Sequence, residues 1–266
     1  MKKIIDKNKF GPWAIIAGAS SGFGKEFAQQ LAADGLNLVL VARRHILIEE
    51  LGQSLAKEFG IKYRTIAIDL ADKNCVPKIA DETKDLDIGL LIANAGGGTI
   101  GKFLSFDEEE IKSTLQLSVM TYASLTHHFG RRLEKRGKGG ILLMGAMGAS
   151  HGIPYLMKDS APRAYIETLG KGLHYELEAQ GIHVTVLLPG TTQTPALDKL
   201  LKTKRFLPMK PGTLKPAVKE TLIAFSKNKV TVIPGFLNRV MDTFTPGSIV
   251  SKLVGGIMKK SGGIIN

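Results

Sequence analysis

The chain has 266 residues, 44% of them hydrophobic, and a formal net charge of +12 from 36 Lys+Arg and 24 Asp+Glu. This composition excludes a disordered chain and a collagen-like repeat, and it supplies a sizeable core. The single cysteine, Cys75, excludes a disulfide framework and a cysteine-based zinc cage. The six histidines show no metal-ligand spacing, so no metal site is expected.

The first ten residues contain no apolar stretch of the length that a signal peptide needs. No run of about 18 uncharged apolar residues predicts a membrane-spanning helix. A single cysteine suits a reducing compartment. These features together lead us to expect a cytoplasmic protein.

Most of the excess positive charge lies toward the C-terminus. Residues 199–266 carry 13 Lys/Arg against Glu220 and Asp242, a net charge of +11, so residues 1–198 carry +1. A solvated lysine-rich face is one interpretation, and attraction to an anionic membrane is the other. The positive charge is the only feature of the sequence that would support nucleic-acid binding, so no nucleic-acid partner is expected.

Seven short apolar runs alternate with amphipathic segments of helical length. Near-continuous apolar runs are typical of strands buried on both faces of a parallel sheet. The alternation predicts a single-domain, Rossmann-type doubly wound α/β fold, with a seven-stranded parallel sheet and helices on both faces. The runs are residues 13–19, 36–42, 63–68, 88–94, 140–146, 183–188 and 230–234, and the main helical segments are 23–34, 46–59, 107–136 and 162–179.

A glycine-rich sequence, AGASSGFG, follows the first run and precedes a helical segment. The first glycine permits a tight turn, the second lets backbone N–H groups approach a pyrophosphate at the helix N-terminus, and the third allows close packing of helix on strand. An ordinary turn is the alternative, but this context favours dinucleotide binding. The candidate residues are Gly18, Ser20, Ser21, Gly22, Phe23 and Gly24.

Two arginines, Arg43 and Arg44, follow the second run. An NAD-selective site usually has an acidic residue here for the ribose 2′-hydroxyl. Guanidinium groups instead match the charge and geometry of the 2′-phosphate of NADP, although surface ion pairs are an alternative role. We therefore expect NADP to be preferred over NAD.

The glycine-rich turn and three further motifs, in this order and spacing, resemble the short-chain dehydrogenase/reductase family over nearly the whole chain. The resemblance implies an adenine-contacting acid after the third strand, an Asn-Ala-Gly signature after the fourth, and a Pro-Gly loop that contacts the nicotinamide carboxamide. The corresponding residues are Asp69, Leu70, Asn94, Ala95, Gly96, Pro189, Gly190, Thr191 and Thr194.

Two further segments, Gly11-Pro12-Trp13 and residues 232–239, resemble the branch of the family with DltE-type and ketoacyl- or hydroxysteroid-type reductases. The resemblance implies a small-molecule carbonyl or alcohol substrate, lipid-like substrates included. It also implies a homodimer or homotetramer, because the family commonly pairs its long central helices.

The resemblance also locates the family's catalytic tetrad, in which a tyrosine gives the proton, a lysine lowers the pKa of that tyrosine, a serine orients the carbonyl and an asparagine supports a water relay. Counting back from the well-matched helix downstream places the tyrosine and lysine positions at Asp159 and Arg163. The serine position, thirteen residues before Asp159, falls on Ala146, and the asparagine position, on the preceding long helix, falls on Ser118. None of the four therefore keeps the family residue.

Each replacement has a chemical consequence. Ala146 has no hydroxyl to donate. Asp159 lies near Arg163, so its pKa is expected at or below the ordinary value of about 3.9, and a carboxylate cannot protonate an alkoxide. Arg163 could still bind ribose hydroxyls as a cationic donor.

Proline is tolerated in the first helical turn, so Pro162 predicts that the helix begins near Ser160, with Ser160 or Asp159 as its N-cap. Residues 150–159 would then form a loop. Tyr155 lies three residues before a lysine in that loop, which makes it the candidate substitute proton donor. His151 is a second candidate.

Beyond Pro246, apolar residues recur at i, i+1, i+4, i+5, i+8 and i+9 and predict one stripe of a helix. The stripe could pack onto the substrate lobe or a dimer partner, or residues 245–266 could contact a membrane surface. We therefore divide the chain into an NADP-binding domain of residues 1–235, with a substrate lobe around 191–215, and a basic amphipathic extension of residues 236–266.

Two functions fit these observations. The first is an NADP(H)-binding oxidoreductase that acts on a carbonyl or alcohol with a non-standard proton donor. The second is a catalytically silent NADP-binding protein that acts as a sensor or binds a partner, which the loss of all four tetrad residues favours.

Overall fold

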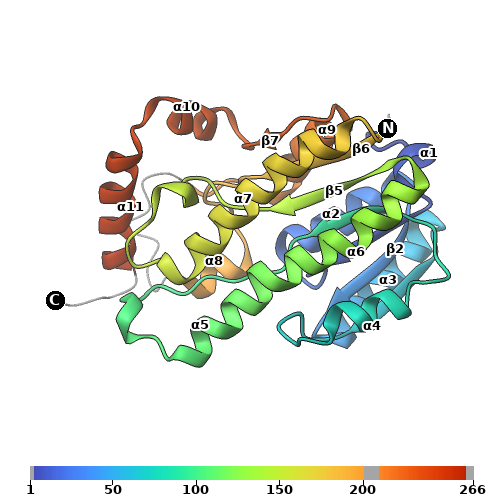
Figure 1. Ribbon diagram of the computed structural model, residues 1–266, viewed down its shortest axis with the longest axis horizontal. Coiled ribbons are helices and arrows are strands. Elements are labelled where there is room, and N and C mark those ends of the chain that lie inside the picture. The colour runs from blue at the N-terminus through green and yellow to red at the C-terminus, as the bar shows by residue number, and fades with distance from the viewer. Residues whose placement is uncertain (1–2, 201–209, 262–266) are drawn as a thin grey trace.

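The computed structural model describes residues 3–200 and 210–261. Within them, one seven-stranded sheet has the order β3-β2-β1-β4-β5-β6-β7, and every neighbouring pair is parallel (Figure 1). This confirms the predicted doubly wound fold. The strands are β1 (Trp13–Ala17), β2 (Asn37–Ala42), β3 (Tyr63–Ala67), β4 (Ile88–Ala93), β5 (Gly139–Met144), β6 (Ile182–Leu187) and β7 (Thr231–Val232).

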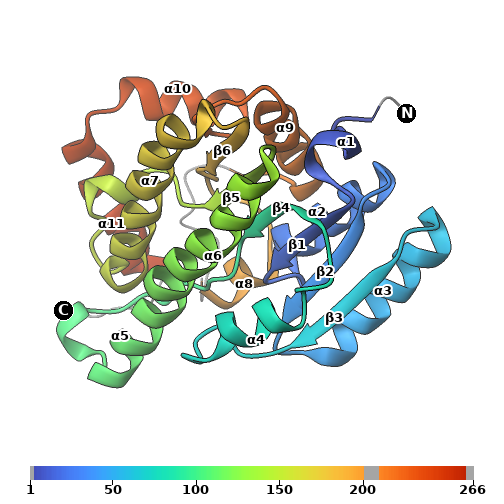
Figure 2. The same cartoon turned by 45° about the vertical axis from the view of Figure 1, so that its right-hand side comes forward.

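Helices cover both faces of the sheet (Figure 2). The core on one face is formed with α1 (Lys7–Phe10), α2 (Gly22–Ala33), α3 (His45–Phe59) and α9 (Leu214–Ser226). The core on the other face is formed with α4 (Cys75–Asp81), α6 (Thr121–Arg136) and α7 (Met157–Glu178).

Strand β1 shows why the strand sequences are apolar throughout. Ala14 and Ile16 belong to the core on one face, whereas Ile15 and Ala17 belong to the core on the other. All four side chains are fully or almost fully buried, because the sheet has no face open to water.

The long helical segment predicted at 107–136 divides into three parts. An α-helix, α5 (Glu108–Leu115), leads into a π-helical turn, η2 (Gln116–Met120), and then into α6. Single π-helical turns are rare and often occur at functional sites. This one contains buried Ser118, the position that the sequence aligned with the family's asparagine.

Helix α7 begins at Met157, so the prediction of a start near Ser160 was wrong. The carbonyl of Leu156 accepts hydrogen bonds from the amides of Asp159 (3.0 Å) and Ser160 (2.8 Å), which form the first turn before the proline is reached. Pro162 therefore lies one turn inside the helix, where its missing N–H leaves the Lys158 carbonyl without its i+4 donor.

The segment predicted as a loop at 150–159 is correspondingly shorter. It starts with a 3-10 turn, η3 (Ala149–His151), and only residues 152–156 connect that turn to α7. The remaining short elements are η1 (Phe103–Ser105) and α8 (Pro195–Leu200).

Two helices end the described chain, α10 (Phe236–Phe244) and α11 (Gly247–Ser261), and they meet at a corner on one side of the molecule (Figure 1). The predicted stripe on α11 is divided. Val254, Ile257 and Met258 pack with Ile153, whereas Leu253 is 62% exposed. No helix in the described ranges is long and apolar enough to cross a membrane.

Candidate functional site

The glycine-rich turn lies against the segment after β4. Gly18 has a φ of +91°, and a Cβ added to it would lie 2.8 Å from the Cα of Ala95. A Cβ on Gly24 would clash with the carbonyl oxygen of Gly18. The Asn94 side chain also donates a hydrogen bond to that oxygen, over 3.0 Å. The turn therefore needs glycine at both positions, and Asn94 holds it in place.

Helix α2 starts at Gly22, which has a φ of +56°. No side-chain hydrogen bond caps this end, and its first turn carries no acidic residue. Gly22 faces the methyl group of Thr194 from the loop after β6, at 3.7 Å from a Cβ added to the glycine. The turn and the Pro-Gly loop thus flank the positive end of the helix dipole, where a pyrophosphate is favoured.

The two arginines after β2 have different partners. Arg44 donates to the hydroxyl oxygens of Ser20 (2.8 Å) and Ser21 (3.2 Å) in the glycine-rich turn. Arg43 instead lies 3.6 Å from a carboxylate oxygen of Asp69, and its side chain is 75% exposed. Arg44 is therefore the arginine that lies beside the turn.

The Asp69-Leu70 motif follows β3. One carboxylate oxygen of Asp69 accepts from the amide of Ala71 (3.0 Å). The carbonyl of buried Leu70 accepts from the hydroxyl of Thr121 on α6 (2.7 Å). The bond from Thr121 fixes the motif relative to α6.

The Pro-Gly loop after β6 leads into the substrate lobe. The hydroxyl of Thr194 accepts from the amide of Leu197 (3.0 Å) and so caps the start of α8. Gly190 lies against the side chain of Asn238, which would be 2.9 Å from an added Cβ. The lobe predicted around 191–215 contains α8 and residues 210–215, and its residues 201–209 lie outside the described ranges.

The arginine at the family's lysine position connects the ends of two central strands. Arg163 donates through one nitrogen to the carbonyl of Met144, at the end of β5, and to the Tyr122 hydroxyl (3.2 Å). Its other terminal nitrogen lies 3.5 Å from the carbonyl of Ala95. The Gly96 backbone lies so close to the guanidinium that a Cβ there would clash with it.

Tyr122 was not identified from the sequence. Its hydroxyl donates to the carbonyl of Ala95 (2.6 Å) and accepts from Arg163. Burial raises the pKa of the phenol, and the nearby Arg163 opposes that shift. The available signal was its spacing, because Tyr122 lies one helical turn after Ser118.

Asp159 does not behave as the sequence predicted. Burial raises the pKa of its carboxyl, and this effect outweighs the hydrogen bond from the Thr99 amide (2.8 Å) and the nearby charges of Lys158 and Arg163. The expected pKa at or below the ordinary value was therefore wrong in direction. The reason is desolvation, which a count of neighbouring charges does not include.

Tyr155 and His151, the two candidate substitute proton donors, both lie beside α11. Tyr155 has a φ of +65°, is partly buried, and packs with Ile153 and Met258 in a small apolar cluster. His151 is exposed, its ring lies against Gly247, and its carbonyl accepts from Ser251 (2.9 Å).

Lys158, the lysine three residues after Tyr155, contacts α5 and the residue Phe106 just before that helix. Its side chain is 5% exposed, with its ammonium group over the ring of Phe106 (4.3 Å from the centroid) and 4.0 Å from Glu110. The lysine therefore joins α7 to α5, which explains how a charged side chain is buried here.

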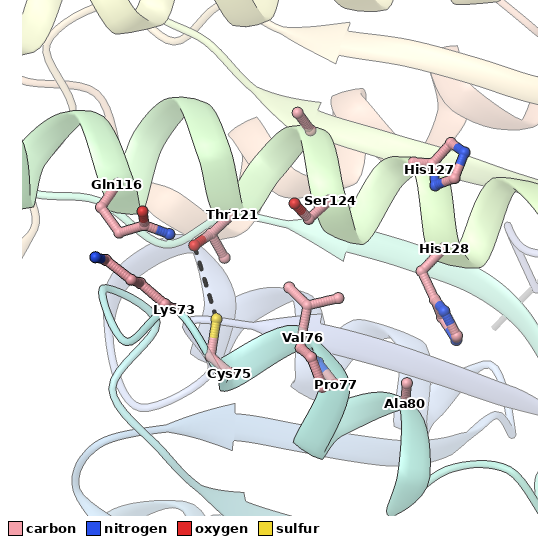
Figure 3. Close-up of a pocket in the computed structure, with 11 residues that line it drawn as sticks. Lys73, Cys75, Val76, Pro77, Ala80, Gln116, Thr121, Ser124, His127 and His128 are labelled. Atoms are coloured by element: carbon pink, nitrogen blue, oxygen red, sulfur yellow. Dashed lines mark hydrogen bonds between the residues drawn. The ribbon is translucent and has the colours of Figure 1, made fainter.

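A cavity of about 530 Å³ lies between α4 and α6 (Figure 3). Cys75 and Thr121 face one another there, with 3.7 Å between the sulfur and the hydroxyl oxygen, and His127 and His128 line its far end. Burial raises the pKa of the Cys75 thiol. None of the cofactor-motif residues lines this cavity, and the described residues contain no group of three or more His, Cys, Asp or Glu that could hold a metal.

The fold, the glycine turn against β4 and the loop after β6 define a Rossmann-type domain with a dinucleotide-binding edge. A family model described as short chain dehydrogenase matches residues 12–205. The chain therefore belongs to the short-chain dehydrogenase family.

Two curated relatives show the branch. The chain is 29% identical to a 7beta-hydroxysteroid dehydrogenase of Clostridium sardiniense over 71% of this chain and 72% of that protein. It is 35% identical to a very-long-chain 3-oxoacyl-CoA reductase of Neurospora crassa over 75% of this chain and 61% of that protein. The expected ketoacyl- and hydroxysteroid-type branch is thereby confirmed, although the chain spans only about three fifths of the Neurospora protein.

Solved structures agree on the fold. A 7beta-hydroxysteroid dehydrogenase matches 94% of this chain and 98% of its own chain, with a TM-score of 0.85 and 24% identity. A short-chain dehydrogenase from Sphingobium yanoikuyae, solved in complex with NADPH, matches 96% of both chains, with a TM-score of 0.79 and 25% identity.

Proposed function

We propose that the protein is an NADP(H)-dependent oxidoreductase that interconverts a carbonyl and an alcohol. The observation that carries this proposal is the close-packed cradle of Gly18, Gly24 and Asn94 beside the uncapped start of α2. A Cβ at either glycine would disrupt this turn, and the uncapped start of α2 leaves backbone N–H groups for a pyrophosphate, so the residues present fit a dinucleotide. NADPH bound there would supply the hydride.

The preference for NADP over NAD rests on Arg44. Its guanidinium already lies within hydrogen-bond distance of both serines of the turn, which places a cation at the edge of the cradle. A 2′-phosphate would accept bidentate hydrogen bonds there, whereas a 2′-hydroxyl would leave the cation without an anionic partner.

For proton transfer we propose Asp159, with Tyr155 as the alternative. Asp159 occupies the family's tyrosine position, and burial raises the pKa of its carboxyl. Such a group can accept the alcohol proton during oxidation and return one to the alkoxide during reduction. Tyr155 packs into the apolar cluster instead, and no hydrogen bond fixes its hydroxyl among the described contacts.

For the substrate we propose an apolar, lipid-like carbonyl compound. Beyond the tetrad positions, the site is bordered by the apolar cluster of Ile153 and Met258, against which Ile100, Leu156 and Leu197 also pack. The names of the relatives, a hydroxysteroid dehydrogenase and a 3-oxoacyl-CoA reductase, are consistent with this class.

A catalytically silent NADP-binding protein is the second candidate. Ala146 offers no hydroxyl to a substrate oxygen, and Arg163 is engaged by the Met144 and Ala95 carbonyls and the Tyr122 hydroxyl. A protein that binds the cofactor and reports its presence would need no proton donor. This candidate makes the same prediction for cofactor binding and the opposite one for turnover.

The test combines binding with turnover. Fluorescence titration should show tighter binding of NADPH than of NADH, and a screen of ketosteroids and 3-oxoacyl thioesters should then reveal NADPH consumption. NADPH binding without turnover of any substrate would favour the silent candidate. Absence of NADPH binding would exclude both.

A further inference from the structure

The helix α10 is amphipathic, and its apolar face points away from the protein. Its five apolar side chains, at positions 236, 237, 240, 241 and 244, fall within about 140° of one another at 100° per residue. Phe236 is 70% exposed and Phe244 is 78% exposed, with Leu237, Val240 and Met241 also exposed. A surface helix normally shows the opposite arrangement, with its apolar face on the core.

The polar face of α10 holds the helix on the protein. Asn238 donates to the carbonyl of Pro234 (2.7 Å) and packs against Gly190 of the cofactor loop. Arg239 is paired with Glu220 of α9 and donates to the carbonyl of Ile233 (3.1 Å). The outward position of the aromatic side chains is therefore fixed by contacts on the opposite side.

Asp242 completes the polar face of α10. Partial burial and the carboxylate of Glu167 on α7 raise the pKa of Asp242, while His151 and Lys171 act in the other direction. At 100° per residue Asp242 falls between Asn238 and Arg239 around the helix, so it belongs to the polar face, and it is exposed.

The neighbouring helix α11 adds to the exposed apolar surface. Ile249 and Leu253 are 45% and 62% exposed, whereas Val250 and Val254 turn inward toward Gly148 and the apolar cluster. Lys252, between the two exposed residues in sequence, is also exposed. The two helices adjoin at a corner of the molecule (Figure 1).

We propose that the apolar face of α10, with Ile249 and Leu253 of α11, inserts into the surface of an anionic lipid bilayer. Large apolar side chains beside cations are the combination that binds at the headgroup boundary, and exposed Lys252 of α11 is the cation beside Ile249 and Leu253. Residues 199–266 carry a net charge of +11, which complements anionic headgroups.

The same charge opposes a second copy of the chain as the occupant. In a twofold dimer the same surface patch meets itself, so a strongly basic segment would face another one. Like charges across an interface disfavour association. An anionic bilayer provides the apolar contact without that repulsion.

The membrane contact has a consequence for the site. Helix α10 contacts Gly190 of the cofactor loop, and α11 contacts Gly148, His151 and Pro154 beside the tetrad positions. A lipid-like substrate could therefore pass from the bilayer toward the site along these helices. This consequence rests on the proposed function, whereas the membrane contact rests on α10 itself.

Flotation of the full-length chain with lipid vesicles tests the proposal. Vesicles of phosphatidylglycerol and phosphatidylcholine should bind the protein more tightly than vesicles of phosphatidylcholine alone. The double variant Phe236→Ser/Phe244→Ser should weaken binding at least about tenfold, because two aromatic side chains lose their apolar contact. Tyr175→Ser, which removes an aromatic side chain that is 69% exposed on α7, should leave binding unchanged.

Three results would overturn the proposal. The first is no binding of the unmodified protein to the anionic vesicles, and the second is equal binding of the double variant. The third is a concentration-dependent dimer that the double variant abolishes without any vesicle binding, which would assign the face to a second copy. NADPH titration of the same samples measures the proposed function independently, so the failure of one is distinguishable from the failure of the other.

Discussion

The cofactor edge and the proton-transfer positions lie side by side, but they depart from the family to very different degrees. At the cofactor edge, Gly18, Gly24 and Asn94 form the contacts that the family pattern implies. On α7, Asp159 and Arg163 lie one helical turn apart, and they occupy positions where the family has other residues. Under the proposed function, the backbone geometry of the cofactor edge is that of the family while the residues proposed for acid–base chemistry differ from it.

The largest effect is expected at the proton-transfer positions. If Asp159 transfers the proton, Asp159→Asn should lower turnover about 10²- to 10⁴-fold with little change in NADPH affinity. Tyr155→Phe is the matched test of the alternative donor. A large loss in Tyr155→Phe with full activity in Asp159→Asn would assign the role to Tyr155.

The pH dependence of reduction distinguishes the same two groups. A carboxyl donor must be protonated, so with Asp159 the rate should rise as the pH falls toward the raised pKa of this group. A tyrosine donor stays protonated well below its ordinary pKa of about 10, so its rate should change little from pH 7 to pH 5. Initial rates of NADPH consumption across this range measure the difference.

The cofactor edge should respond most strongly to Gly24→Ala. The added Cβ meets the Gly18 carbonyl, so we expect a loss of about 1–3 kcal/mol in unfolding free energy and a marked loss of NADPH affinity. Gly172→Ala on α7 is the control, because an added Cβ there has no atom within 4 Å and helix propensity favours alanine by about 1 kcal/mol. Chemical denaturation and fluorescence titration report both quantities.

Arg44→Ala should have a smaller and more selective effect. Removing the cation beside Ser20 and Ser21 should weaken NADPH about tenfold and leave NADH nearly unchanged. Arg43→Ala is the comparison, because this exposed side chain is paired with Asp69 and should matter less. Equal losses for both cofactors would contradict the assignment of Arg44 to the 2′-phosphate.

The smallest effect is expected on stability. The pKa of Asp159 is raised on folding, so its ionisation destabilises the fold as the pH rises through that pKa. Asp159→Asn, which can still accept from the Thr99 amide, should therefore raise the melting temperature slightly at pH 7. The difference between the two proteins should shrink as the pH approaches 4, which thermal melts at several pH values would measure.

The sequence was sufficient for the fold because the apolar runs are nearly continuous and a parallel sheet buries both faces of each strand. It was also sufficient to bring Gly18, Gly24 and Asn94 together, since the carboxyl ends of adjacent parallel strands meet at one edge. It failed for the start of α7, because bonds to the Leu156 carbonyl form before Pro162 is reached.

Two other features could not be predicted from sequence patterns. Desolvation of Asp159 depends on the surrounding packing and not on its neighbours in the chain. The spacing of apolar residues in α10 is as regular as in α11, but spacing does not show which side of a helix faces the protein. Contacts of Asn238 and Arg239 decide that orientation.

The π-helical turn at Gln116–Met120 also sets the rotational phase of the helix that precedes it. One extra residue in a turn rotates everything before it by about 100° relative to everything after it. In the present phase Glu110 of α5 lies 4.0 Å from buried Lys158. Deleting one residue within the turn would therefore separate this ion pair while leaving α6 in place, so a local change in helix winding controls a contact that joins α5 to α7.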